Sequence, residues 1–231
     1  MAIPSDPFSS ILWNLGFAIC HQLPERSFVL GGYQMPMCAR DTGIYLGFLA
    51  VVLFYVLTRR YRKAKIFDRP TIMAAIFGMA LYLFDGASSY LGLLSTNNPM
   101  RLATGLLFGI SAGLLLCTAA SVLLTKGDPK ERVFTWLDLS FFYFPAAFLW
   151  GFLVWTDPGV IGWYVLATVI SIGFLGFFLL LAMLAWGATR GFTLAPGRQR
   201  RRLLLAAAIT EFVIIALLWL GHLITSGLVI D

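Results

Sequence analysis

Long apolar segments separated by short polar ones make up most of this sequence. A membrane-spanning helix needs about 20 apolar residues, because the hydrocarbon core is about 30 Å thick and each helical residue rises about 1.5 Å. Five segments reach that length and a shorter sixth ends at a basic cluster, so we expect six spans, at about 42–58, 71–95, 102–125, 133–155, 159–187 and 203–228. Residues 8–19 are too few and too polar to cross, and predict an interfacial helix. The expected fold is therefore all-α, a polytopic membrane protein of six transmembrane helices with a short N-terminal interfacial helix.

The composition agrees with this fold and excludes other classes. Of the 231 residues, 59% are hydrophobic and 12% are charged, which is about half the charged share of a soluble domain. These values exclude a cytosolic globular enzyme, a disordered protein and a nucleic-acid-binding protein, despite the net charge of +6. The sequence shows no linker, so residues 1–231 are expected to form a single integral-membrane domain.

Basic residues are distributed unevenly between the two sides of the predicted bundle. Fourteen of the 17 lie in the connections that follow the first, third and fifth spans, and these connections share one side. The positive-inside rule places that side in the cytoplasm, so we expect a multi-pass protein of the cell membrane with both termini outside. We interpret the run Arg198–Arg202 as a topology anchor that touches anionic lipid, not as a nucleic-acid site.

Glycines recur at four-residue spacing on two of the spans. Gly43 and Gly47 lie on the first, and Gly105, Gly109 and Gly113 lie on the third. Small residues allow helix backbones to approach closely in lipid, where no hydrophobic force drives helices together. We expect these glycines to be helix-packing contacts.

Polar groups concentrate on the expected outer side. Such groups are costly within a membrane, which makes them candidates for function. Counting about 1.5 Å per helical residue brings eight of them to one layer, without showing that they converge laterally. The eight are Cys20, His21, Cys38, Arg40, Asp85, Asn98, Arg101 and His222.

Four motifs in this region resemble the signature of a known family. They are Cys-His-x-x-Pro-x-Arg-Ser-Phe at 20–28, Cys-Ala-Arg-x-Thr-Gly at 38–43, Asp-Gly at 85–86 and Ser-x-x-Asn-x-x-Arg-x-x-Thr-Gly at 95–105. In these motifs, residues 18–125 are similar to a bacterial and archaeal family of small polytopic membrane proteins of unknown function. That family often has a second cysteine directly after Cys-Ala-Arg, where this chain has Asp41. The resemblance implies which residues belong together and implies no established activity.

Cys20, His21 and Cys38 form a candidate metal site. Two thiolates and one imidazole suit a zinc or copper ion. Candidates for a fourth ligand are Asp41, Asp85 and His222. A disulfide between the two cysteines is an alternative interpretation, because both are expected to face an oxidising compartment. A redox-active thiol pair is another.

Arg26, Arg40 and Arg101 are the three basic residues expected on the outer side, where Asp85 and Asn98 also lie. A guanidinium group binds phosphate or carboxylate well, so these arginines are candidates for an anion site. An internal ion pair of Asp85 with Arg101 or Arg40 is equally open, because it neutralises a carboxylate that is costly to bury.

Glu211 and His222 lie eleven residues apart on nearly the same face of the last predicted span. Two titratable groups in this arrangement suit a proton relay or a hydrogen bond between helices. We favour the hydrogen bond, since proton paths generally need more members.

The leading hypothesis is a cell-membrane protein with an outward-facing Cys/His/Arg/Asp site that binds a metal ion, a small anion or a lipid head group. Whether it is an enzyme stays open, because the sequence carries no P-loop, dinucleotide fingerprint or H-E-x-x-H motif. One alternative is a structural accessory subunit of a larger membrane complex with a Cys20–Cys38 disulfide, and another is a thiol-disulfide redox protein. The expected partners are the lipid bilayer, an anionic lipid or small-molecule ligand and membrane-complex subunits, but no nucleic acid.

Overall fold

The computed structural model describes residues 3–194 and 197–228, and this part of the chain contains seven α-helices. The first, α1 (Pro7–Phe17), is short, and the other six belong to segments long and apolar enough to cross a membrane. This confirms the expected all-α architecture with six candidate spans. The six are α2 (Ala39–Leu57), α3 (Arg69–Tyr90), α4 (Asn98–Ala120), α5 (Ser140–Trp155), α6 (Gly159–Arg190) and α7 (Arg198–Leu228).

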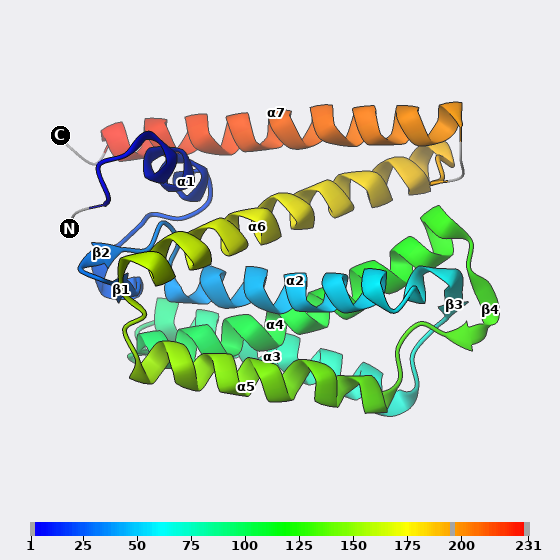
Figure 1. Ribbon diagram of the computed structural model, residues 1–231, viewed down its shortest axis with the longest axis horizontal. Helices are drawn as coiled ribbons and strands as arrows, with labels where there is room; N and C mark the ends of the chain where they lie inside the picture. The colour runs from blue at the N-terminus through cyan, green and yellow to red at the C-terminus, as the bar shows by residue number, and fades with distance from the viewer. Residues whose placement is uncertain (1–2, 195–196, 229–231) are drawn as a thin grey trace.

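Helices α2 and α4 form the centre of the bundle and make its most extensive contact (Figure 1). Helix α3 packs against α4, α6 packs against α2, and α7 runs along α6 at the edge. Within the apolar windows of the spans, 61% of the α4 residues are buried inside the protein, compared with 11% of the α7 residues. The central pair is therefore held by protein contacts, whereas α7 presents most of its apolar surface outward.

Glycines set the distance between α2 and α4. A Cβ added to Gly109 would lie 2.1 Å from the carbonyl oxygen of Ile44, and one added to Gly105 would lie 2.2 Å from that of Arg40. A Cβ on Gly43 would likewise meet the carbonyl oxygen of Leu102 at 2.5 Å. These contacts confirm the packing role expected for the four-residue glycine spacing, because only glycine leaves room for the facing backbone.

Polar side chains begin several of the helices. Asp6, Cys38, Asp68 and Asn97 each accept a hydrogen bond from the backbone N–H three residues further on, at the start of α1, α2, α3 and α4. Such caps satisfy an N–H group that has no partner within the helix. At Cys38 the acceptor is a sulfur atom, which places this side chain at the first turn of α2.

The two ends of the bundle differ in structure and charge. One end, which we call the hairpin end, carries α1 and the antiparallel pair β1 (Val29–Leu30) and β2 (Tyr33–Gln34). The other, the basic end, carries the parallel pair β3 (Lys63–Lys65) and β4 (Asp128–Arg132). All three basic connections lie at the basic end, as Figure 1 shows. Which end faces the cytoplasm stays a prediction.

Candidate functional site

Cys20, Cys38 and Asp41 come together at the hairpin end. Their two sulfur atoms and one carboxylate oxygen all lie within 4.8 Å of one another. Cys38 caps α2 and Asp41 lies in its first turn, whereas Cys20 comes from the segment after α1. Cys20 is buried, the other two are partly exposed, and both cysteines are free thiols. The structure thus gives Asp41, considered from the sequence only as a fourth ligand, a place in this Cys–Asp group.

Hydrogen bonds connect the three residues directly. The backbone N–H of Cys38 donates to Sγ of Cys20 at 3.2 Å, and the backbone N–H of Asp41 donates to Sγ of Cys38 at 3.5 Å. The Cys38 thiol donates to Oδ2 of Asp41 at 3.1 Å. Each sulfur therefore receives an N–H group, which favours the charged form of a thiol once its proton has left.

Negative charge in the Cys–Asp group is costly when no cation is near. The hydrogen bond with Cys20, burial and the charge of Asp41 together raise the pKa of the Cys38 thiol far above its usual range. These surroundings therefore favour the neutral form of the Cys38 thiol. A divalent ion that displaced this proton would turn the repulsion among the donors into attraction.

Two glutamines hold the segment that brings Cys20 to α2. Gln22, with a positive φ of 51°, donates from Nε2 to the carbonyl oxygens of Trp13 at 2.8 Å and Pro36 at 3.0 Å. Nε2 of Gln34 donates to the backbone carbonyl oxygen of Gln22 at 2.6 Å, and the backbone carbonyl oxygen of Gln34 accepts from the indole N–H of Trp163 at 2.8 Å. These buried bonds tie α1, the hairpin and α6 together, and fix the position of Cys20.

Arg40 and Asp85 form a largely buried ion pair next to the Cys–Asp group. Nη2 of Arg40 lies 2.6 Å from Oδ2 of Asp85, which also accepts from the Thr104 hydroxyl at 3.0 Å. The guanidinium lies 5.8 Å from the centre of the Tyr82 ring. Nε of Arg40 and Oδ1 of Asp85 are buried without a hydrogen-bond partner. The structure thus brings Asp85 to Arg40, one of its two expected partners.

The other polar residues expected here have different roles. Nε of Arg101 donates to the Thr96 hydroxyl at 3.1 Å, and Nδ2 of Asn98 donates to the carbonyl oxygen of Ser27 at 3.1 Å. Arg26 ends a short 3₁₀ turn and is exposed. The contacts of Arg101 and Asn98 tie the loops of the hairpin end to the start of α4, and do not join the Cys–Asp group.

His21, the third member of the ligand set expected from the sequence, lies outside the close Cys–Asp group of the described residues. Its exposed ring packs against the ring of His222, with centroids 4.5 Å apart. The His222 ring also hydrogen-bonds the carbonyl oxygen of Phe17. Glu211 lies eleven residues earlier on α7, about 16 Å along the axis, and its Oε1 is buried without a partner. The structure therefore joins His222 of α7 to Phe17 of α1 by a hydrogen bond and to His21 by ring packing, and the proton relay stays a prediction.

Comparison with known proteins places this site in a family. A family model described as "Predicted membrane protein (DUF2085)" matches residues 20–115. An uncharacterised protein of Methanothermobacter thermautotrophicus is 35% identical over 98 residues, which make up 42% of this chain and 83% of that relative. The chain belongs to the DUF2085 family. An uncharacterised protein of Methanocaldococcus jannaschii is 36% identical over 103 residues, 45% of this chain and 64% of that relative. No solved structure matches the chain.

The DUF2085 match contains the Cys–Asp group and the Arg40–Asp85 pair. It begins at Cys20 and ends within α4, so α5, α6 and α7 lie outside it, together with Glu211 and His222. Since these two relatives are themselves uncharacterised, the family establishes a predicted membrane protein and supplies no activity.

Proposed function

We propose that this protein binds a soft or borderline divalent metal ion at the hairpin end, with Cys20, Cys38 and Asp41 as ligands. The observation that carries the proposal is the convergence of these three donor atoms within 4.8 Å, although Cys20 and Cys38 are 18 residues apart. Zinc–sulfur bonds of about 2.3 Å in a tetrahedron put two sulfurs about 3.8 Å apart, so small side-chain shifts suffice.

The donor set favours zinc or copper over harder ions. Thiolates select soft and borderline metals, whereas calcium and magnesium prefer all-oxygen sites. Three protein ligands leave a fourth position, for which water and His21 are the candidates. A position held by water is the pattern of reactive zinc sites, because such a site can accept a further ligand.

A thiol-disulfide function is the second candidate, since the same proximity of Cys20 and Cys38 suits a reversible disulfide. A reactive cysteine normally has a lowered pKa, however, and the surroundings of Cys38 raise its pKa. This observation argues against Cys38 as a reactive thiol. A disulfide that merely pins the outer loop of an accessory subunit is the remaining alternative.

We further propose that the hairpin end faces the outside of the cell membrane. The three basic connections at the opposite end support this orientation through the positive-inside rule. The metal site would then be reached from the extracytoplasmic side, and the bilayer is the partner of the outward apolar surface of α7.

The test is the metal content per protein after purification without chelator. We expect one zinc or copper ion in the wild type, and a large loss in Cys20→Ala, Cys38→Ala and Asp41→Asn. Cys117→Ala is the matched control, because this third cysteine is buried in α4 and lies outside the group. His21→Ala reports whether the fourth position belongs to His21 or to water.

Thiol counting separates the alternatives. A wild type without metal and with one free thiol in the unreduced, denatured protein would support the structural disulfide. Thiols that cycle with an added redox buffer, again without metal, would support the redox function.

A further inference from the structure

A large cavity opens at the basic end of the bundle, far from the Cys–Asp group. It has a volume of about 1010 Å³ and lies between α2, the end of α4 and α6. This volume is at the upper end of the range of about 300–1,000 Å³ typical of ligand pockets. Its walls are mainly apolar and include Phe48, Val52, Cys117, Leu179 and Met183.

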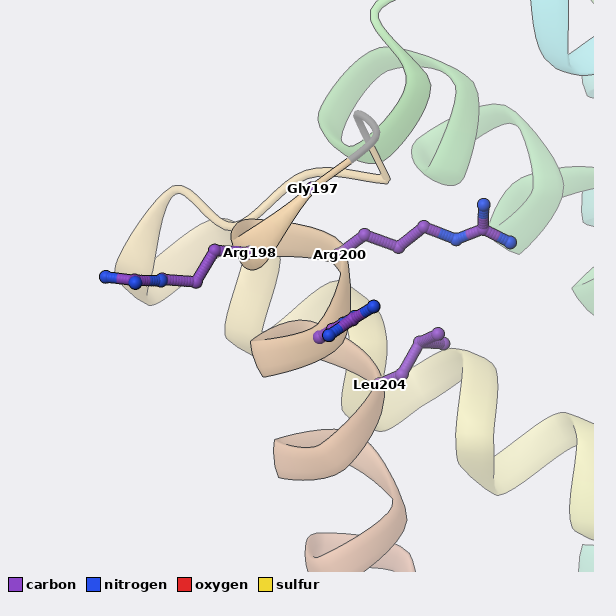
Figure 2. Close-up of a pocket in the computed structure, with 5 residues that line it drawn as sticks. Gly197, Arg198, Arg200 and Leu204 are labelled. Atoms are coloured by element: carbon purple, nitrogen blue, oxygen red, sulfur yellow. The ribbon is translucent and has the colours of Figure 1, made fainter.

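Three cationic side chains line the same cavity. They are Arg62 after α2, Lys126 after α4 and Arg200 in the first turn of α7. Figure 2 shows a separate pocket at this end, lined by Gly197, Arg198, Arg200, Arg201 and Leu204, in which the Arg198 and Arg200 side chains point in opposite directions. The one acidic residue among the described lining residues is Asp128, whose carboxylate accepts from the backbone N–H of Lys130 at 2.8 Å. The polar rim is therefore cationic, while the interior is apolar.

The backbone at this rim is irregular. Ser121–Thr125 forms a π-helical turn at the end of α4, and Leu124 and Thr125 of this turn line the cavity. Lys126 follows with a φ of 51°, in the left-handed region that favours glycine. Single π-turns and such backbone outliers occur frequently at functional sites. Here they turn the backbone so that Lys126 lines the cavity, whereas a regular helix would continue along the axis of α4.

We propose that this cavity binds an anionic phospholipid, with an acyl chain between α2 and α6 and the phosphate at Arg62, Lys126 and Arg200. An apolar interior with a cationic rim complements an amphipathic anion. A phospholipid is the amphipathic anion that surrounds a membrane-spanning bundle, and each basic residue near an anionic membrane surface contributes about 1 kcal/mol, or roughly fivefold in affinity. The proposal is independent of the metal site.

The test uses the full-length protein, delipidated in detergent and titrated with phosphatidylglycerol or phosphatidylcholine under native mass spectrometry. We expect one phosphatidylglycerol to bind at least tenfold more tightly than phosphatidylcholine. Replacing the three cationic residues, as Arg62→Gln, Lys126→Gln and Arg200→Gln, is expected to weaken phosphatidylglycerol roughly 100-fold, at about 1 kcal/mol per residue.

A matched triple variant keeps the charge change and leaves the cavity intact. Arg69→Gln, Lys130→Gln and Arg198→Gln remove three exposed basic residues of the same end that do not line the cavity. We expect this control to bind phosphatidylglycerol within threefold of the wild type. Equal losses in the two triple variants would show a general charge effect and overturn the proposal.

A second variant tests whether the apolar interior of the cavity holds an acyl chain. Gly176 lines the cavity, and a Cβ there would meet the Phe48 ring at an ordinary 3.8 Å, so Gly176→Leu fills the space without striking backbone. We expect at least tenfold weaker phosphatidylglycerol binding, and binding at wild-type strength would contradict an acyl-chain site. Complete competition by glycerol phosphate would likewise overturn the proposal in favour of a free phosphate site. If the cationic triple variant does not fold, Arg200→Gln alone and the lipid preference of the wild type decide the question.

Discussion

Replacing Gly109 by alanine tests whether the glycine contact between α2 and α4 holds the bundle together. The added Cβ would lie 2.1 Å from the carbonyl oxygen of Ile44 and 2.9 Å from the backbone nitrogen of Phe48. Ordinary contact begins near 3.4 Å, and backbone cannot rotate away as a side chain can. The two helices must therefore separate by on the order of 1 Å over their main contact, which is overpacking of a close-packed interface.

The magnitude follows from two opposing effects. Overpacking costs up to about 3 kcal/mol, and alanine gains about 1 kcal/mol of helix propensity over glycine. We expect Gly109→Ala to lower the free energy of unfolding by about 2 kcal/mol, or the melting temperature by roughly 4–8 °C for a chain of this size.

Gly176→Ala is the matched control for this prediction. Its Cβ would have one neighbour, the Phe48 ring at 3.8 Å, so only the propensity gain applies and the variant should be as stable as the wild type or more stable. Melting in detergent, followed by circular dichroism, gives the sign for each variant. Equal melting temperatures for the two variants would refute the close approach of α2 and α4.

Three further predictions concern the hairpin end. Arg40→Ala should lower the free energy of unfolding by about 3 kcal/mol, and by more than Arg101→Ala, because it leaves the Asp85 carboxylate buried without its cation. Melting temperatures like that of the wild type for both variants would contradict this. Metal affinity should fall more than tenfold for each pH unit from 8 to 6, because two thiolate ligands require the displacement of two thiol protons and the pKa of Cys38 is raised. Calorimetry that showed no pH dependence would argue against thiolate ligands. In intact cells that express the Cys117→Ala variant, a membrane-impermeant thiol reagent should label reduced Cys20 or Cys38. Labelling only after permeabilisation would reverse the predicted orientation.

Hydropathy predicts the spans well, because their length is set by the bilayer and not by neighbouring helices. The predicted second span, 71–95, extends beyond the end of α3 at Tyr90, since apolar composition continues through Leu91–Leu94 after the helix has ended. A backbone reversal decides that end, with Gly92 at a φ of 69°. The short β3–β4 pair was not predicted, because it joins two loops far apart in the sequence.

The candidate site was predictable in depth but not in lateral position. Counting residues along the helices places Arg40, Asp85 and Arg101 at one level, and does not show that Arg40 faces Asp85 while Arg101 turns to Thr96. The position of Asp41 beside Cys38 follows from a local pattern, because a residue three positions after an N-cap lies next to the capping side chain. Because a cysteine is an uncommon cap, the cap was identified only from the structure.

The family match divides the molecule in a way that separates the two proposed sites. It covers the hairpin loop, α2, α3 and most of α4. The 98 residues shared with the Methanothermobacter relative make up 83% of that relative but 42% of this chain, so the relative is much the shorter of the two. The metal ligands lie entirely within the matched part, whereas the cavity needs α6 and Arg200 of α7 for one wall and part of its rim. Metal binding is therefore the property to seek in the shorter relative, and lipid binding is expected only where the additional helices close the cavity. A purified relative that holds the metal and shows no preference for phosphatidylglycerol would separate the two functions in a single comparison.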